Sequence, residues 1–189
     1  MQREILNGVL ARGLVNPVIE PEMYGIHCHR LPNLMTSFGG GADIVPPVVN
    51  GNVIISAGDL SGCEWPSGRV NPVAQFQSIE PTESIDYGVF VYRGSFEMKQ
   101  AAAMSRGVAA NGLLMRGNPA AALELAKEAV AIDPGEITGQ TALGDVSAAL
   151  GQKDVARTAW EAALKVAMQL EPDAQSNYVP DLEGKLKKL

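Results

Sequence analysis

The densest group of side chains that could perform chemistry is His27-Cys28-His29, near the start of the chain. On a β-strand, His27 and His29 would share one face, and two imidazoles on one face can bind the same metal ion. A structural metal site, however, needs about four ligands at recognisable spacing, and the sequence supplies only this cluster. We therefore expect no metal ion, and we interpret the segment as a partly exposed strand with Cys28 buried.

The two cysteines leave two other possibilities open. A disulfide between Cys28 and Cys63 would suit a domain outside the cytoplasm, where oxidising conditions let such bonds persist. A cysteine nucleophile with a histidine base would also need a third, orienting group. The acidic residues available for that role are Asp43, Asp59 and Glu64.

A second candidate site combines His27 and His29 with Asp59 and Trp65. Asp59 and Trp65 lie in a turn-rich segment, where an indole ring could stack against a sugar. The other interpretation is that Trp65 is buried beside Pro66 and anchors the segment. These four residues would form the site of a small enzyme or carbohydrate-binding module, and we assign no catalytic residue among them.

Composition and charge exclude several classes of protein. The chain has 189 residues, of which 46% are hydrophobic, and that apolar content argues against a disordered chain. Its net charge of −6 argues against binding to nucleic acid, which requires excess positive charge to neutralise phosphates. No apolar stretch approaches the roughly 18 residues of a membrane-spanning helix, so we expect no membrane insertion by this chain.

The composition changes at about residue 97. Before this point proline and glycine are frequent and lysine does not occur, whereas alanine is dense after it and every lysine lies there. Alanine and lysine favour helices, and glycine and proline interrupt regular structure. The sequence therefore predicts an α+β fold, with a small mixed or β-rich region over residues 1–96 packed on a helical domain over residues 97–189.

Local patterns predict the elements of residues 1–96. Apolar spacing favours a short helix over 3–13, and alternation favours strands over 23–31 and 84–94. Asn50-Gly51 predicts a hairpin, or else a turn that precedes a strand over 53–55. Asn71-Pro72 predicts the start of a short helix that contains Val73 and Phe76. These elements would give three or four strands with one or two helices.

A repeat of 34 residues organises the second region. It relates Gly117 to Gly151, Ala122 to Ala156, Ala126 to Trp160, and Ala129 to Ala163. The pattern predicts two helix pairs, over 97–115 with 119–132 and over 138–150 with 153–170, the last continuing towards Pro172. Asn118 would cap the second helix and Pro119 would occupy its first position. A final helix, starting at Pro180, would cap the array.

These positions resemble the tetratricopeptide repeat family over residues 105–170. The second unit carries the resemblance, through Leu143-Gly144, Gly151, Ala156, Trp160 and Ala163. The first unit departs from it, with Ala109-Ala110 in place of the leucine–glycine pair, and Met168 replaces the closing proline that Pro134 supplies in the first unit. The resemblance implies antiparallel helix pairs that act as a scaffold, the first helix of each pair lining a concave groove.

Helical spacing assigns six residues to that groove. They are Asn111, Leu114, Met115, Thr138, Thr141 and Asp145. The set contains no arginine or lysine, so the basic clamp that the family uses for peptide carboxylates is absent. Such a groove would hold an extended or helical apolar segment of a partner, or it would be filled by the chain's own N-terminal region.

The whole chain is also similar to the soluble C-terminal region of bacterial membrane glycosyltransferases of family 39, the dolichyl-phosphate-mannose mannosyltransferase-like type. The similarity lies in Tyr24-Gly25-Ile26, Arg30-Leu31-Pro32 and the segments 48–68, 71–76 and 87–97, followed by the helices. It implies an accessory domain outside the cytoplasm that carries no catalytic residue.

The function expected from the sequence is therefore that of a non-catalytic interaction or scaffold domain without a cofactor. Its partner would be a protein, a peptide or a second copy of the chain. The alternative remains the small enzyme or carbohydrate-binding module described above. The domain would be periplasmic if the glycosyltransferase resemblance holds, and cytoplasmic otherwise.

Overall fold

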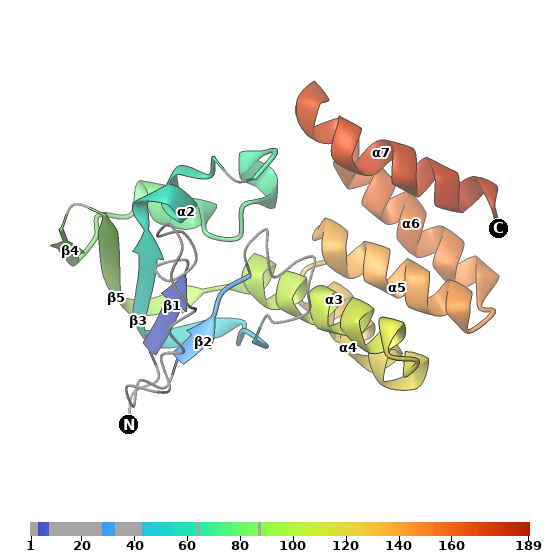
Figure 1. The fold of residues 1–189 in the computed structure, drawn as a ribbon, viewed down its shortest axis with the longest axis horizontal. Helices are drawn as coiled ribbons and strands as arrows, with labels where there is room; N and C mark the ends of the chain where they lie inside the picture. The colour runs from blue at the N-terminus through green and yellow to red at the C-terminus, as the bar shows by residue number, and fades with distance from the viewer. Residues whose placement is uncertain (1–3, 8–27, 33–42, 64, 87) are drawn as a thin grey trace.

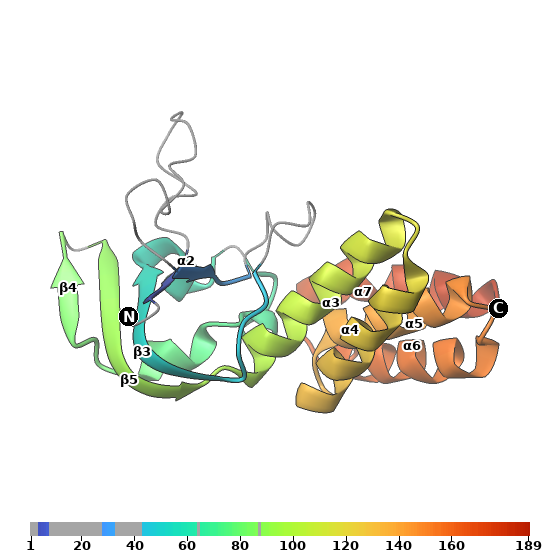
Figure 2. The same ribbon diagram turned by 90° about the horizontal axis from the view of Figure 1, so that it is seen from below.

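The computed structural model describes residues 4–7, 28–32, 43–63, 65–86 and 88–189, with the backbone alone described for 4–7, 28 and 29 (Figure 1). The fold is α+β, with a sheet followed by five packed helices. The sheet lies at one end of an elongated molecule and the helices lie at the other, where the chain ends (Figures 1 and 2).

Five strands of the described residues form one sheet, in the order β2-β1-β3-β5-β4. Its antiparallel part consists of β3 (Val48–Ser56), β5 (Val89–Glu97) and β4 (Glu83–Ile85). β1 (Glu4–Asn7) pairs in parallel with β3 on one side and with β2 (Cys28–Arg30) on the other. Three strands thus form a continuous antiparallel ribbon, and two short parallel strands extend it.

The short helix predicted over 3–13 is wrong in its described part, because Glu4–Asn7 is a strand. Both edges of β1 are paired, with Ile5 opposite Val53 on one side and opposite His29 on the other. Pairing on two edges satisfies the backbone over this stretch and outweighs a weak local preference for helix. Of the strand predicted over 23–31, the structure describes strand only over 28–30, and residues 23–27 lie outside the described part.

Asn50-Gly51 does not form a turn, because β3 runs without interruption through both residues. Gly51 has a φ of 141° and pairs with Gly94 of β5. A Cβ atom at Gly94 would lie 3.2 Å from the ring of Phe96. The two glycines therefore allow the long β3–β5 ribbon to bend towards the helices, as Figure 2 shows.

The single strand predicted over 84–94 is instead the hairpin of β4 and β5. Asp86 adopts a left-handed φ of 47°, and the amide of Gly88 donates to the carbonyl of Ile85 over 3.1 Å. Aspartate tolerates this conformation better than most residues. The turn at Asp86 therefore separates β4 from β5, whereas the alternation of apolar residues predicts one strand.

One face of the sheet is covered by α2 (Ala57–Ser61) and by the 3-10 helix η3 (Ala74–Ser78). η3 corresponds to the short helix predicted from Asn71-Pro72, but it begins at Ala74 and so contains Phe76 and not Val73. Asn71 Oδ1 accepts from the amide of Val73 over 3.0 Å. Phe76 packs against Tyr92 and Phe96 with ring centroids 4.8 and 5.1 Å apart. The core of the sheet region is completed by Leu31, Val45, Val49, Val53, Ile55, Val73, Met98 and Ala101.

The second region consists of α3 (Lys99–Met115), α4 (Pro119–Ile132), α5 (Ile137–Ala149), α6 (Lys153–Ala167) and α7 (Pro172–Lys187). α3 packs with α4, α5 packs with α6, and α7 lies on α6 (Figure 1). Asn118 caps α4 by accepting from the amide of Ala121, and Pro119 stands at the first position, as predicted. No helix in the described ranges has both the length and the apolar character required to cross a membrane.

Small residues stand where the helices cross. A Cβ atom at Gly144 would lie 2.3 Å from the indole of Trp160, so glycine is required for α6 to pack on α5. A Cβ atom at Gly107 would lie 2.9 Å from the backbone of Thr138, so glycine also allows the close approach of α3 to α5. Glycine is therefore required for close packing of the helices at both crossings.

Two helix ends differ from the prediction. α6 ends at Ala167 and does not continue towards Pro172. α7 begins at Pro172, and Pro180 lies inside it, not at its start. Pro172 has the favourable first position, while burial of Ala174 and Leu182 on either side of exposed Pro180 keeps the helix continuous.

Candidate functional site

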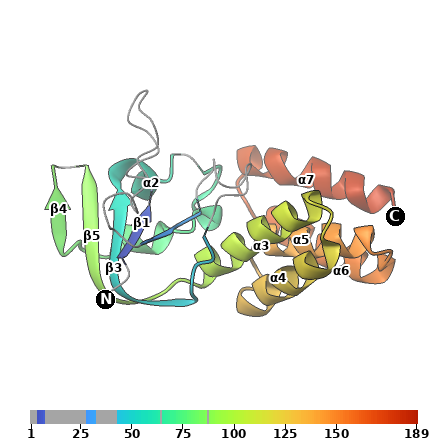
Figure 3. The same ribbon diagram turned by 60° about the horizontal axis from the view of Figure 1, so that its bottom comes forward.

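The six residues assigned to the groove all lie on α3 and α5, which run side by side in the same direction (Figure 3). We call the surface formed by Asn111, Leu114, Met115, Thr138, Thr141 and Asp145 the α3–α5 face. Five of the six are half-buried, whereas Met115, at the end of α3 far from the sheet, is 86% exposed. The face thus presents amide, hydroxyl and apolar groups at moderate depth.

Leu114 of the α3–α5 face is held by packing. Leu114 packs against a small cluster that includes Ala110, Ala142 and Val146. This cluster joins α3, α4 and α5, so Leu114 contributes to the stability of the array as well as to its surface. α3 also approaches the first turn of α5 closely at Gly107, next to Thr138.

Asp145 is the centre of a polar network that joins three helices. Its Oδ1 accepts from Trp160 Nε1 of α6 over 2.9 Å, and its Oδ2 accepts from Lys185 Nζ of α7 over 3.0 Å. Lys185 also pairs with Asp181 over 2.9 Å. Burial alone would lower the pKa of Lys185, but the two carboxylates outweigh it and raise that pKa. Asp145 therefore holds α7 in place and is not free to bind a partner.

The pairing of Asp145 with Lys185 could not be predicted, because Lys185 lies 40 residues further along the chain. The contact with Trp160, by contrast, has a local signal. Asp145 directly follows Gly144, the residue against which Trp160 packs, so its carboxylate is close to the indole N–H.

Glu136 is a buried carboxylate at the other end of the face, where α5 begins. It is 5% exposed, and it accepts from the amides of Thr138 over 3.0 Å and Gly139 over 2.5 Å. Burial raises the pKa of Glu136 to about 7, with a smaller contribution from Asp133, although the two backbone hydrogen bonds act to lower it. The pKa of Tyr178 on α7 is raised by burial and by the negative charge of Glu136.

Residues 65–70 of the first region, which we call the 65–70 segment, cross this same end of the helical array. Val70 lies in one buried cluster with Ile137, Leu170 and Ala174, and Trp65 is half-buried against that cluster. Gln100 Nε2 of α3 donates to the carbonyl of Arg69 over 2.7 Å. Part of the N-terminal region therefore does pack on the helices, near the start of α5 and α7.

The residues of the second candidate site are not assembled into one site by the described structure. His27 lies outside the described residues, and His29 is described only as a backbone position in β2. Asp59 is 5% exposed and accepts from the Ser56 hydroxyl over 2.5 Å, which starts α2 beside the sheet. Trp65, by contrast, packs against the helical cluster. Asp59 and Trp65 thus have separate structural roles.

Cys63 is exposed, and its thiol is free, so it does not form the disulfide considered with Cys28. Its nearest polar contact is the carbonyl of Gly58, 3.7 Å from Sγ. Within the part of the chain that the structure describes, no group of three or more His, Cys, Asp or Glu side chains is placed to hold a metal ion.

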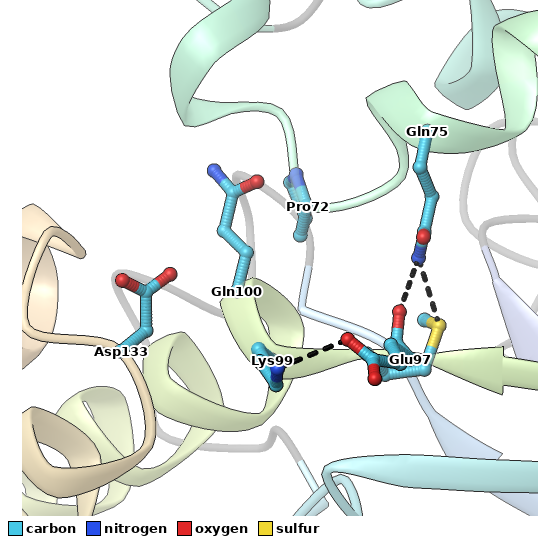
Figure 4. A pocket seen from close by; sticks show the side chains of 7 residues that line it. Pro72, Gln75, Glu97, Lys99, Gln100 and Asp133 are labelled. Carbon is cyan, nitrogen blue, oxygen red and sulfur yellow. Dashed lines mark hydrogen bonds and ion pairs between the residues drawn. The ribbon is translucent and has the colours of Figure 1, made fainter.

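An open pocket of about 280 Å³ lies where the two regions meet (Figure 4). Its lining residues are Pro72, Gln75, Glu97, Met98, Lys99, Gln100 and Asp133. Lys99 pairs with Glu97 over 3.0 Å, and both side chains are largely exposed. Gln75 Nε2 donates to the carbonyl of Glu97 and contacts Met98 Sδ. These groups satisfy one another, and the lining contains no histidine, cysteine or serine that could act as a nucleophile or base.

The polar residues of this region thus build helix caps, ion pairs and links between helices. On the α3–α5 face, Asn111 and Thr141 are half-buried and Met115 is exposed. Neither a protein-family model nor a curated protein matches the chain, so its function has to be inferred from this geometry.

Proposed function

We propose that the chain is a non-catalytic interaction domain, a scaffold of the tetratricopeptide type that binds a protein or peptide partner on the α3–α5 face. The observation that supports this most is the direct packing of α3 on α5 at Gly107, with α4 and α6 behind them. Two first helices held side by side in this way form one continuous surface, in the manner of helical-repeat proteins.

The chemistry of the face favours a neutral or apolar partner segment. Met115 is 86% exposed, and Asn111 on α3 and Thr141 on α5 offer an amide and a hydroxyl. The nearest cation of α7, Lys185, is occupied by Asp145 and Asp181. An apolar side chain on the partner would bury Met115, and its backbone would pair with the amide and hydroxyl groups.

Two helix pairs can suffice because both sides of the array are covered. α7 covers α6, held by the Lys185–Asp145 ion pair. On the other side, the amide of Val45 donates to Ser105 Oγ over 3.1 Å, and Arg106 Nη1 donates to the carbonyl of Val45 over 2.8 Å. Repeat arrays need such caps because each unit leaves an apolar face uncovered.

The resemblance to envelope glycosyltransferases extends the proposal. If the chain is the accessory domain of such an enzyme, its partner would be another component at the cell envelope. That assignment stays a prediction from the sequence.

A peptide selection tests the proposed function. Peptides selected from a random phage-displayed library on the full chain should bind it with dissociation constants of 100 μM or tighter, on the order of those of other peptide-recognition domains. Met115→Asp should weaken that binding at least tenfold. Met168→Asp is the matched control, because Met168 is 63% exposed at the cap of α6 and lies away from the face.

The proposal is contradicted if no peptide is enriched over a blank surface. It is also contradicted if the selected peptides bind the Met115→Asp and Met168→Asp variants equally well.

A further inference from the structure

The 65–70 segment has little regular structure of its own, yet it packs on the helices. Its only helical turn is η2 (Gly68–Val70). Ser67 and Val70 are nevertheless each only 6% exposed. The segment lies at the end of the helical array where α3, α5 and α7 begin (Figure 3).

The seat recognises the segment through three kinds of contact. Val70 enters the apolar cluster formed by Ile137, Leu170 and their neighbours. Glu171, exposed before the first turn of α7, lies near the Ser67 hydroxyl and the positive charge of Arg69, and of these the Ser67 hydroxyl is the larger cause of its lowered pKa. The amide of Gln100 binds the carbonyl of Arg69. The seat thus combines an apolar cluster, the Glu171 carboxylate and the Gln100 side-chain amide, which binds a backbone carbonyl.

We infer that the 65–70 segment is an intramolecular ligand, and that its seat on α3, α5 and α7 binds in trans an extended peptide of the same chemistry. That peptide carries a small aliphatic side chain at the position of Val70, a basic residue directly before it and a hydroxyl residue two positions further back. This seat is distinct from the α3–α5 face around Met115, so the inference does not depend on the proposed function.

The hold of the segment is modest, which makes exchange possible. The segment buries the side chains of Val70 and Ser67, the indole of Trp65 is half-buried, and the polar contacts with the helices are few. Segments with few buried contacts open locally at low cost in free energy. A tethered ligand has an effective concentration on the order of millimolar, so a free peptide competes poorly until the tethered copy is weakened.

The test uses a labelled peptide of residues 65–72, WPSGRVNP, and fluorescence anisotropy. The Val70→Asp full chain should bind it at least tenfold more tightly than the unmodified full chain, because the aspartate releases the tethered copy. The same peptide with aspartate in place of its valine should not bind either chain. Adding Glu171→Gln to the released chain should weaken binding of the peptide, but not of a peptide with alanine at the Ser67 and Arg69 positions.

Two controls test whether the Val70→Asp variant is folded and whether the peptide displaces the segment in the unmodified chain. Circular dichroism shows whether Val70→Asp retains the helices; if it does not, the milder Val70→Ala takes its place. Hydrogen exchange on the unmodified chain should show faster exchange of residues 65–70 when the peptide is added at millimolar concentration. The inference is overturned if a folded variant binds the peptide no more tightly than the unmodified chain and exchange is unchanged. Met115→Asp should leave this binding unaltered, which separates the result from that of the proposed function.

Discussion

The two regions of this molecule obtain their structure in different ways. In the helical region, the caps and glycines that end or start a helix lie next to it in the sequence, as Asn118 and Pro119 do at the start of α4. In the sheet region, the conformation of a residue depends on a strand far away in the sequence, as Gly51 of β3 does on Gly94 of β5. Local signals therefore determine the first kind of structure, and long-range pairing determines the second.

The largest expected effect concerns the tightest crossing in the helical region. Gly144→Ala places a methyl group where the indole of Trp160 lies, 2.3 Å away, and should lower the free energy of unfolding by about 3 kcal/mol. Chemical denaturation followed by circular dichroism measures this change.

The matched control for that substitution is Gly184→Ala in α7, where no atom lies within 4 Å of the added group. It should stabilise the chain by about 1 kcal/mol, because alanine favours helix more than glycine does. A Gly144→Ala variant as stable as the unmodified chain would show that α5 and α6 do not pack as described.

The second effect is a dependence on pH that arises where α5 begins. Burial raises the pKa of Glu136 to about 7 from 4.5. A carboxyl group with a raised pKa in the folded state adds stability below pH 4.5, and that stability is lost as the pH rises through 7. Relative to Glu136→Gln, the unmodified chain should lose roughly 3 kcal/mol of unfolding free energy over this range.

Denaturation at a series of pH values measures the difference between the two chains. Substitution of the exposed Glu161 by glutamine should leave the pH dependence as it is in the unmodified chain. Parallel pH profiles for the unmodified chain and Glu136→Gln would mean that Glu136 is not buried in solution.

The smallest effect tests the bend in the sheet. Gly51 has a φ of 141°, which an alanine adopts only with strain, so Gly51→Ala should cost about 1–2 kcal/mol of unfolding free energy. Gly58→Ala in α2 should change stability by less than about 0.5 kcal/mol, since its added group makes only ordinary contacts. Equal stability of the two variants would contradict the continuous β3 strand.

The same contrast explains which parts of the structure could be predicted. The helices and the Asn118 cap follow from local propensity and periodicity, and so do the left-handed glycines at 117 and 151, each with a φ of 75°. The assignment of Glu4–Asn7 to helix failed because a strand needs two partners that the local sequence does not reveal. The turn predicted at Asn50-Gly51 is wrong for a related reason, because Gly51 pairs with Gly94 within the bent β3–β5 ribbon.

The candidate site shows the same limit. The six residues of the α3–α5 face could be placed on α3 and α5 from helical spacing alone. The pairing of Asp145 with Lys185, and the seating of Val70 among Ile137 and Leu170, could not, because each joins segments that only the folded chain brings together. For Trp65 the sequence left sugar stacking and burial beside Pro66 open, and the structure packs its half-buried side chain on the helices.

The central claim is that the α3–α5 face is the surface on which a partner binds. A titration of the ¹⁵N-labelled full chain with a library-selected peptide, followed by NMR, tests it most directly. The account predicts that the chemical shift changes gather on Asn111, Met115 and Thr141, and that β4 and the end of α6 stay unchanged. Changes confined to the sheet region, or to residues around Met168, would contradict it.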